Sequence, residues 1–299
     1  MLDLDPMLFN PAYSGFFDGR GRYGVVYRNQ WATVSAPFQT LSATAEVSLV
    51  RSNRSMSGLS TGLCITTDHE GSLNYGSTSA VLVLSYFQSL NRSGSHILSA
   101  AVEAGGGQTG FSTDGIEMGD PSEQFERTNV TYPTLGAGMA WFWQVNDILY
   151  TKTGFALRNI NEPDISYLGF SDTRLARRLT AYTRAEWRAA PQWGILPLLG
   201  FQHQGQFNEL VIGCNTRWYL RESQQDYFAL DAGLITRLGD ALAVNIAVLW
   251  HDWTFAFSYD ANISKLAAAS HTIGAFEVGI VYMIHKKDYR NRALPCPII

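Results

Sequence analysis

The stretch RGRYGVVYRNQW, residues 20–31, decides the fold because its side chains alternate in character. One parity is apolar or aromatic, and it consists of Tyr23, Val25, Tyr27 and Trp31. The other parity is polar, and it consists of Arg20, Arg22, Arg28 and Gln30. Successive side chains of a strand point to opposite faces, so this stretch predicts a strand with one apolar and one polar face.

The same alternation returns along the rest of the chain. It is clearest in residues 38–50, 178–188, 209–221, 226–238, 253–260 and 276–282. Many of these runs exceed the usual globular strand of about five or six residues. Tight turn signals such as Asn146-Asp147, Gly239-Asp240 and His251-Asp252 separate them, and no segment has a convincing helical period. The pattern predicts an all-β protein of about fourteen strands.

Long two-faced strands joined by short turns are typical of a transmembrane antiparallel β-barrel, with apolar side chains toward lipid and polar ones toward the lumen. Closure is expected, because an open edge would leave backbone groups unpaired in hydrocarbon. The alternative is a soluble β-sandwich or propeller. It explains less well the aromatic residues near the strand ends, and a propeller needs a regular repeat that is absent. Those aromatic residues are Tyr23, Tyr27, Trp31, Trp187, Trp218, Trp250 and Trp253.

Composition narrows the classes of function. Only 16% of the residues are charged, below the roughly 25% of soluble domains, and the net charge of -4 argues against a nucleic-acid partner. The three cysteines, Cys64, Cys214 and Cys296, form neither a disulfide framework nor a zinc-ligand set, and we expect Cys296 to be structural.

No apolar run approaches the roughly 20 residues of a membrane helix. Met1–Asp5 lacks the basic start and apolar core of a signal peptide. The protein is therefore either cytoplasmic, or its sequence begins after a leader that has been removed. The barrel pattern favours the second interpretation.

The chain divides into three expected parts. Residues 1–19 form an N-terminal segment, residues 20–284 the barrel, and residues 285–299 a basic tail on the periplasmic side. The N-terminal segment contains NPAYSG (10–15), in which Asn-Pro favours a turn. We expect this segment to pack in or under the lumen as a plug. Its expected packing motif comprises Asn10, Pro11, Tyr13, Arg28, Gln30 and Trp31, with Arg28 or Gln30 as its hydrogen-bond partner.

Two long polar stretches, 111–133 and 160–173, interrupt the alternation. Barrels carry long loops on the outer side, so we expect both to be extracellular. TTDHEG (66–71) is interpreted as a polar turn rather than a metal site, and AGGGQTG (104–110) as a strand with close backbone approach rather than a phosphate loop. No catalytic residue, metal ligand or cofactor site is predicted.

Charged residues recur on the inward parity of several strands. They are Arg22, Glu46, Arg184, Glu186, Arg188, Glu209, Arg217, Asp231, Arg237 and Glu277. Buried charges need partners, so this set predicts a lumenal salt-bridge network. The alternative is a charged channel, and we favour a plugged lumen over an open one.

Several motifs together resemble a known family. FNPAYSGFFDG (9–19) followed by YRNQW (27–31) resembles the opening of the PorP/SprF family of outer-membrane proteins, from the type IX secretion and gliding systems of Bacteroidetes. TGLCITTDHEGSLN (61–74), FSYDANIS (257–264), GAFEVGIVY (274–282) and the late Cys-Pro are similar to later parts of that family. The resemblance implies an outer-membrane barrel that is not an enzyme and that normally carries a signal peptide.

The resemblance also implies partners. Members of that family work with periplasmic, peptidoglycan-associated lipoprotein components of the secretion machinery, or serve large surface adhesins secreted by it. We therefore expect a structural and docking component surrounded by outer-membrane lipids, whose periplasmic turns and tail bind such partners. The alternative functions are a porin or a transporter of hydrophobic substrates, and a barrel enzyme is a third class.

Overall fold

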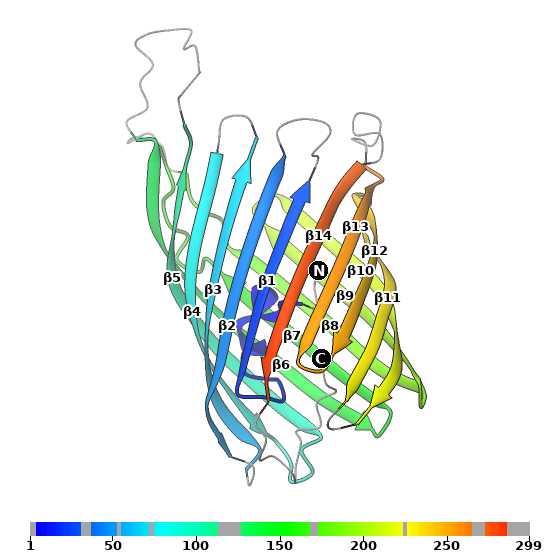
Figure 1. Cartoon of the computed structure of the whole chain (residues 1–299). Coiled ribbons are helices and arrows are strands. Elements are labelled where there is room, and N and C mark those ends of the chain that lie inside the picture. Colours follow the sequence, from blue (N-terminus) through cyan, green and yellow to red (C-terminus); the bar gives the residue numbers. More distant parts are fainter. Residues whose placement is uncertain are drawn as a thin grey trace, which may run out of the picture.

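Alternating strands form one closed antiparallel barrel (Figure 1). The computed structural model describes residues 4–30, 37–52, 55–71, 75–112, 127–167, 173–223, 226–264 and 273–285. The strands are β1 (Gly21–Gln30), β2 (Phe38–Ser52), β3 (Ser57–Glu70), β4 (Tyr75–Ser89), β5 (His96–Gly110), β6 (Asn129–Asn146), β7 (Leu149–Arg158), β8 (Arg178–Ala190), β9 (Trp193–Gln204), β10 (Phe207–Glu222), β11 (Tyr227–Arg237), β12 (Ala241–Trp250), β13 (Trp253–Asn262) and β14 (Ile273–Ile284).

Each strand pairs with its neighbours in the chain, and the first strand pairs with the last. Along the closing seam, Arg22 of β1 lies opposite Met283 of β14, and Gln30 lies opposite Ala275. The sheet therefore has no free edge in the described residues, and all its strands exchange backbone hydrogen bonds with two neighbours. The predicted fold, a closed antiparallel barrel of about fourteen strands, is confirmed.

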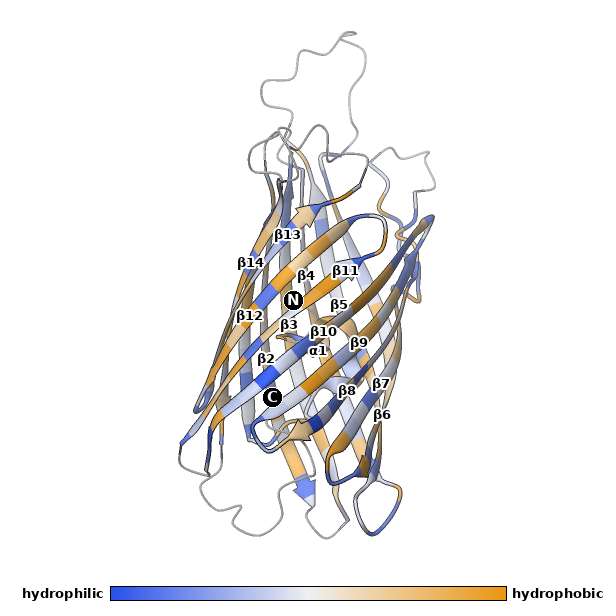
Figure 2. Ribbon diagram, turned by 90° about the vertical axis from the view of Figure 1, so that its right-hand side faces the viewer, coloured by the Kyte–Doolittle hydropathy of each residue, from blue (hydrophilic) through white to orange (hydrophobic). Residues whose placement is uncertain are grey.

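The barrel wall is apolar outside, and its inner surface carries buried charged side chains beside an apolar cluster. Leu82 and Val102 on the outer surface are 62% and 59% exposed, whereas Arg217 and Glu46 on the inner surface are 2% and 1% exposed. The strands in Figure 2 accordingly change colour repeatedly between apolar and polar along their length. This arrangement reverses that of a soluble sandwich, and it is stable where hydrocarbon surrounds the wall.

The connections between strands differ at the two ends of the barrel. At one end they are all short, spanning 53–56, 90–95, 147–148, 191–192, 223–226 and 251–252. The other end carries the two longest connections, 111–128 and 159–177. We call these the short-turn end and the long-loop end. The short-turn end is at the bottom of Figure 1.

The tryptophans of the described residues gather near one end of the barrel. They lie in the short-turn halves of their strands, and they are Trp141, Trp143, Trp187, Trp193, Trp218, Trp250 and Trp253. Several stack in pairs, such as Trp141 on Trp143 and Trp193 on Trp218, each with ring centroids 5.4 Å apart. Such rings suit a membrane–water interface, so we call this set the tryptophan belt.

The glycine run of residues 105–107 lies within β5, as a close backbone approach would require. A Cβ on Gly105 would lie 2.1 Å from the carbonyl oxygen of Ala80, and one on Gly107 would lie 2.5 Å from the ring of Tyr132. The glycines thus let β4 and the Tyr132 side chain come close to β5. Tyr132 belongs to β6, so the expected loop 111–133 is too long: β6 already begins at Asn129, with Val130 buried inward.

The chain ahead of β1 forms two short helical turns, α1 (Pro6–Phe9) and the 3-10 turn η1 (Pro11–Tyr13). Among the described residues, no helix is both long and apolar enough to cross a membrane. Several expectations fall outside the described residues: Trp31, most of the loop 111–133, part of the loop 160–173, and the tail beyond His285 with Cys296.

Candidate functional site

The N-terminal segment, residues 4–19, lies inside the barrel (Figure 1). The sequence dictates its local shape, because Pro6 and Pro11 each stand in the first turn of α1 and η1, where proline is tolerated. The Asn10 side chain accepts a hydrogen bond from the backbone N–H of Ala12 at 2.9 Å, which caps η1. Gly15 adopts a φ of +78°, and a Cβ there would meet Ser60 of the wall. The segment is therefore a tight double turn fitted to the wall.

Asn10 crosses the lumen to the wall opposite β1. Its Nδ2 donates to the carbonyl oxygens of Met139 at 2.8 Å and Phe155 at 3.3 Å, on β6 and β7. Two glycines make room for it: a Cβ on Gly138 would lie 2.1 Å from Asn10 Oδ1, and one on Gly154 would lie 2.5 Å from Asn10 Nδ2. This fit explains why a small, doubly hydrogen-bonding amide stands at position 10.

The backbone carbonyls of the segment are also satisfied by the wall. Arg158 donates to the oxygens of Met7 at 2.7 Å and Leu8 at 2.6 Å. Thr180 donates to Phe9 at 2.7 Å, and Ser85 donates to Ser14 at 2.6 Å. Buried backbone groups without partners are costly, so these side chains are what allows an irregular segment inside the barrel.

A second set of polar contacts joins the segment to the start of β1. Glu46 accepts from the N–H of Gly15 at 3.0 Å and from Arg22 at 2.9 Å. Arg51 donates to the oxygens of Gly15 at 3.0 Å and Phe17 at 2.7 Å. Charged partners on both sides of Gly15 therefore fix the point where the segment turns into the wall.

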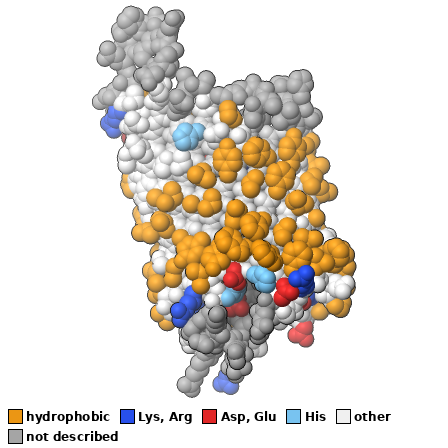
Figure 3. Space-filling model, in the orientation of Figure 1, with side chains coloured by type: hydrophobic (Ala, Val, Ile, Leu, Met, Phe, Trp, Pro, Cys, Tyr) orange, Lys and Arg blue, Asp and Glu red, His pale blue; other side chains and the backbone are white. Residues whose placement is uncertain are grey.

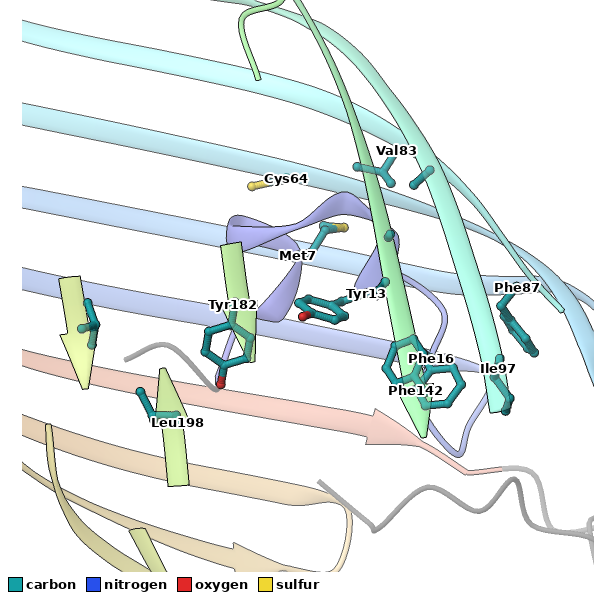
Figure 4. Packing of buried hydrophobic residues seen from close by; sticks show 14 residues of the cluster. Met7, Tyr13, Phe16, Cys64, Val83, Phe87, Ile97, Phe142, Tyr182 and Leu198 are labelled. Atoms are coloured by element: carbon teal, nitrogen blue, oxygen red, sulfur yellow. The ribbon is translucent and has the colours of Figure 1, made fainter. Parts of the chain in front are cut away.

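Apolar packing also holds the N-terminal segment against the wall (Figure 4). Met7, Tyr13 and Phe16 are buried in one cluster with side chains of the wall, among them Phe87 and Phe142. The ring of Phe16 stacks on that of Phe142, and Tyr13 meets the same ring edge-on at 5.8 Å. Fully burying each large apolar side chain contributes roughly 1.5–3 kcal/mol, so the segment is held by apolar contact as well as by hydrogen bonds.

The expected partners of the NPAYSG turn differ from those observed. Arg28 donates instead to Asp260 at 2.8 Å and Glu277 at 3.0 Å, away from the turn. The expected hydrogen bond from Arg28 to the segment was therefore wrong. Gln30 lies at the long-loop end of β1, whereas η1 contacts β4 to β7. The physical reason is that the segment crosses the lumen before it joins β1, so the neighbours of η1 belong to the far wall, and Gly15 returns toward β2 and β3.

The inward charges form several groups rather than one network. Arg22 pairs with Glu46 beside the segment, and Arg217 pairs with Asp231 at 2.8 Å, with Glu186 3.7 Å away. Arg237 shares Asp260 with Arg28. Arg184 is buried and inward as expected.

Two expected members differ from the rest. Arg188 pairs with Glu222 at the rim of the short-turn end, where both side chains are partly exposed. It therefore belongs to the rim and not to the buried interior. Glu209 is exposed and lines a cavity at the long-loop end.

Sequence reasoning missed the residues that hold the segment. Arg158, Glu103 and Arg51 were not singled out, although Arg158 pairs with Glu103 at 2.9 Å and binds two carbonyls of the segment. Asp260, at the end of the alternating run 253–260, is not in the predicted network. Inward parity marks Arg158, Glu103 and Asp260, whereas Arg51 faces inward only because a β-bulge between Ser48 and Val50 shifts the alternation. Only the cross-strand register shows which of them meet.

Above the segment the lumen opens into a cavity of about 520 Å³, which we call the vestibule. Leu8 and Phe9 of the segment form part of its lining, and the rest comes from the long-loop halves of the strands. Arg28, Arg158, Arg178 and Arg237 contribute cations to it, and Asp68, Glu103, Glu209, Asp260 and Glu277 contribute carboxylates. The lumen is thus divided into a filled part and a polar vestibule.

Solved barrels share the fold at low sequence identity. The toluene transporter TbuX of Ralstonia pickettii is 12% identical with a TM-score of 0.51, covering 94% of each chain. The monoaromatic hydrocarbon channel CymD is 9% identical with a TM-score of 0.51, covering 95% of this chain and 93% of its own. A mutant of the monoaromatic hydrocarbon channel TodX is 8% identical with a TM-score of 0.52 and covers 94% of each chain.

No curated protein matches the chain. The family model described as the type IX secretion system membrane protein PorP/SprF matches residues 4–282, which include the N-terminal segment and nearly all of the barrel. Family and fold together locate the protein in the outer membrane and support a role related to secretion. The chain belongs to the PorP/SprF family of type IX secretion system membrane proteins.

Proposed function

We propose that the protein is a structural and docking component of the type IX secretion and gliding machinery. Its short-turn end binds a periplasmic, peptidoglycan-associated lipoprotein of the machine or a surface adhesin that the machine secretes. The observation that carries the proposal is the filled lumen. A segment held inside the barrel by Asn10, Arg158 and an apolar cluster lies in the path through the lumen, which favours a scaffold over an open pore.

The rim of the short-turn end offers a surface for such a partner. Arg221 pairs with Asp226 at 3.1 Å and His285 with Asp252 at 2.7 Å, all on or beside the short turns. Exposed pairs of this kind contribute roughly 0–1 kcal/mol to stability, so their side chains are free to exchange partners. Figure 3 shows charged and histidine side chains gathered just below the apolar surface at this end. Short turns face the periplasm in bacterial barrels, which supports a periplasmic partner.

A second candidate function is transport of a small or hydrophobic substrate. The vestibule and the likeness to hydrocarbon channels favour it, although that likeness concerns the fold alone. Transport would require the N-terminal segment to leave its seat. The two candidates therefore differ in a measurable property, the conductance of the unmodified protein.

Affinity purification from native outer membranes tests the docking role. We expect the tagged protein to recover a periplasmic lipoprotein of the secretion machinery or a secreted adhesin. Charge reversal at the rim, Arg188→Glu with Arg221→Glu, should reduce that recovery. The matched control is Arg177→Glu at the long-loop end, which should leave it unchanged. Recovery of neither class of partner would contradict the proposal.

Planar-bilayer recording separates docking from transport. We expect the full-length protein to show almost no conductance, and a variant lacking residues 4–17 to show sustained channels. Long-lived channels from the unmodified protein would instead favour the transporter. Heat-dependent mobility on a denaturing gel verifies that the shortened barrel has folded.

A further inference from the structure

One wall of the vestibule carries a continuous row of polar side chains on β8, β9 and β10. Arg178 lies opposite Gln204 across the β8–β9 pairing, and Gln202 lies opposite Glu209 across the β9–β10 pairing. All four side chains line the vestibule. The row therefore runs from a guanidinium through two amides to a carboxylate, across three adjacent strands.

Arg178 stands out among the arginines of the vestibule. Arg28, Arg158 and Arg237 each form ion pairs with carboxylates. Within the described residues, no carboxylate lies within ion-pair distance of Arg178, and its buried Nε makes no hydrogen bond. A buried donor without a partner lowers the stability of the fold by about 1–3 kcal/mol, and by more when it is charged. A ligand that accepts a hydrogen bond from Arg178 would recover this free energy.

The neighbours of Arg178 also favour the binding of an anion there. It pairs across strands with Arg158, and like charges directly opposite each other are destabilising. Arg158 is already engaged by Glu103 and by the carbonyls of Met7 and Leu8. One pleat further along β8, Thr180 binds the carbonyl of Phe9, so Arg178 stands directly above the floor that the segment provides.

We propose that the vestibule binds a carboxylate on Arg178, borne by a peptide-like ligand whose amide groups meet Gln202 and Gln204. The guanidinium offers a planar fork that fits a carboxylate, and side-chain amides both donate to and accept from a peptide backbone. Glu209 at the far end of the row accepts from an N–H of the same ligand. A volume of about 520 Å³ is suited to a few residues of polypeptide or a small acid, since ligand pockets range over roughly 300–1,000 Å³.

The site lies at the long-loop end and makes no use of the rim at the short-turn end. It is therefore independent of the docking role. The group that the site recognises is a carboxylate. Two sources can supply it, the C-terminus of a polypeptide and a free carboxylic acid.

Fluorescence anisotropy with the full-length protein in detergent tests the site. The probe is tetra-alanine carrying a fluorophore on its N-terminus and a free C-terminal carboxylate. Its C-terminal amide is the matched control ligand. We expect the free acid to bind at least about tenfold more tightly than the amide, because the charge-assisted hydrogen bonds to Arg178 depend on the carboxylate.

Arg178→Gln should remove this preference, so that acid and amide bind that variant equally. Arg177→Gln is the matched control, because Arg177 is an exposed neighbour paired with Glu162 outside the vestibule. It should retain the preference. Displacement of the probe by millimolar acetate would assign the site to free carboxylic acids, and resistance to acetate would assign it to polypeptide termini.

Equal binding of acid and amide by the unmodified protein would overturn the proposal, as would an unchanged preference in Arg178→Gln. The comparison of the two ligands on the unmodified protein needs no variant, so the test survives if Arg178→Gln fails to fold.

Discussion

The filled part of the lumen and the vestibule are enclosed by the same wall, yet they differ in what satisfies their inward polar groups. In the filled part, Arg51, Ser85, Arg158 and Thr180 donate to backbone carbonyls of the N-terminal segment. In the vestibule, arginines are satisfied by carboxylates of other strands, and Arg178 has no such carboxylate among the residues that the structure describes.

The difference shows how one barrel can be filled in one part of its lumen and open to a ligand in the other. Neutral carbonyls satisfy a cation's donors without cancelling its charge, so the segment is fixed by geometry and by apolar packing. Ion pairs in the vestibule can exchange one anion for another. The filled part is therefore held by many fixed contacts, and the vestibule is where we propose that a ligand competes.

The largest expected effect comes from Arg158→Gln. It removes the donors to Met7 and Leu8 and leaves Glu103 without its cation, which should destabilise the fold by roughly 3–5 kcal/mol. Arg217→Gln leaves Asp231 without its cation and should destabilise the fold by a similar amount. Arg217, however, lies away from the segment. Thermal unfolding, followed by gel mobility, measures both.

Labelling of Cys64 distinguishes the two variants. This thiol is 4% exposed and belongs to the cluster that includes Met7. In folded protein we expect Arg158→Gln to speed its reaction with a maleimide and Arg217→Gln to leave it unchanged. Equal labelling of the two variants would show that Arg158 does not hold the segment.

A smaller effect is expected from Gly138→Val. The added side chain would occupy the place of the Asn10 amide, so the segment should be displaced at a cost of about 1–3 kcal/mol. Ala137→Val adds similar bulk to the neighbouring outward position and should be nearly neutral. Bilayer conductance measures the outcome, and a silent Gly138→Val barrel with normal Cys64 protection would contradict the close fit.

The smallest effect is expected from Asn10→Ala, which removes the cap of η1 and the hydrogen bonds to Met139 and Phe155 while keeping the apolar cluster. We expect a loss of about 1–2 kcal/mol. Asn208→Ala, at the exposed long-loop rim, is the control. Hydrogen exchange of the N-terminal amides measures the change, and unaltered protection would mean that apolar packing alone holds the segment.

The strands could be predicted from sequence because their signal is local. Alternation in residues such as 20–31 and 178–188 depends only on the period of two, which hydrocarbon outside and polar groups inside impose on every strand. The ends of the strands were less certain. Residues 129–133 are predicted as part of a loop because most of them are polar, although they belong to β6 and Val130 faces inward.

The site was predicted only in part because its contacts are distant in the chain. Arg28 meets Asp260, 232 residues away, because barrel closure brings β13 and β14 beside β1. Asn10 meets β6 and β7 because the segment crosses the lumen. Parity tells which side chains face inward, but the closed register decides which of them touch.

The tryptophan belt has a mechanical consequence. Because its rings sit near the short-turn end, with pairs such as Trp193 and Trp218 stacked along the wall, displacement in either direction along the membrane normal moves them out of the interface. The bilayer therefore sets the height of the short-turn rim, which begins directly beyond Trp250 and Trp253. A load applied to this rim is therefore resisted at the lipid boundary by the tryptophans of β6, β8, β9, β10, β12 and β13.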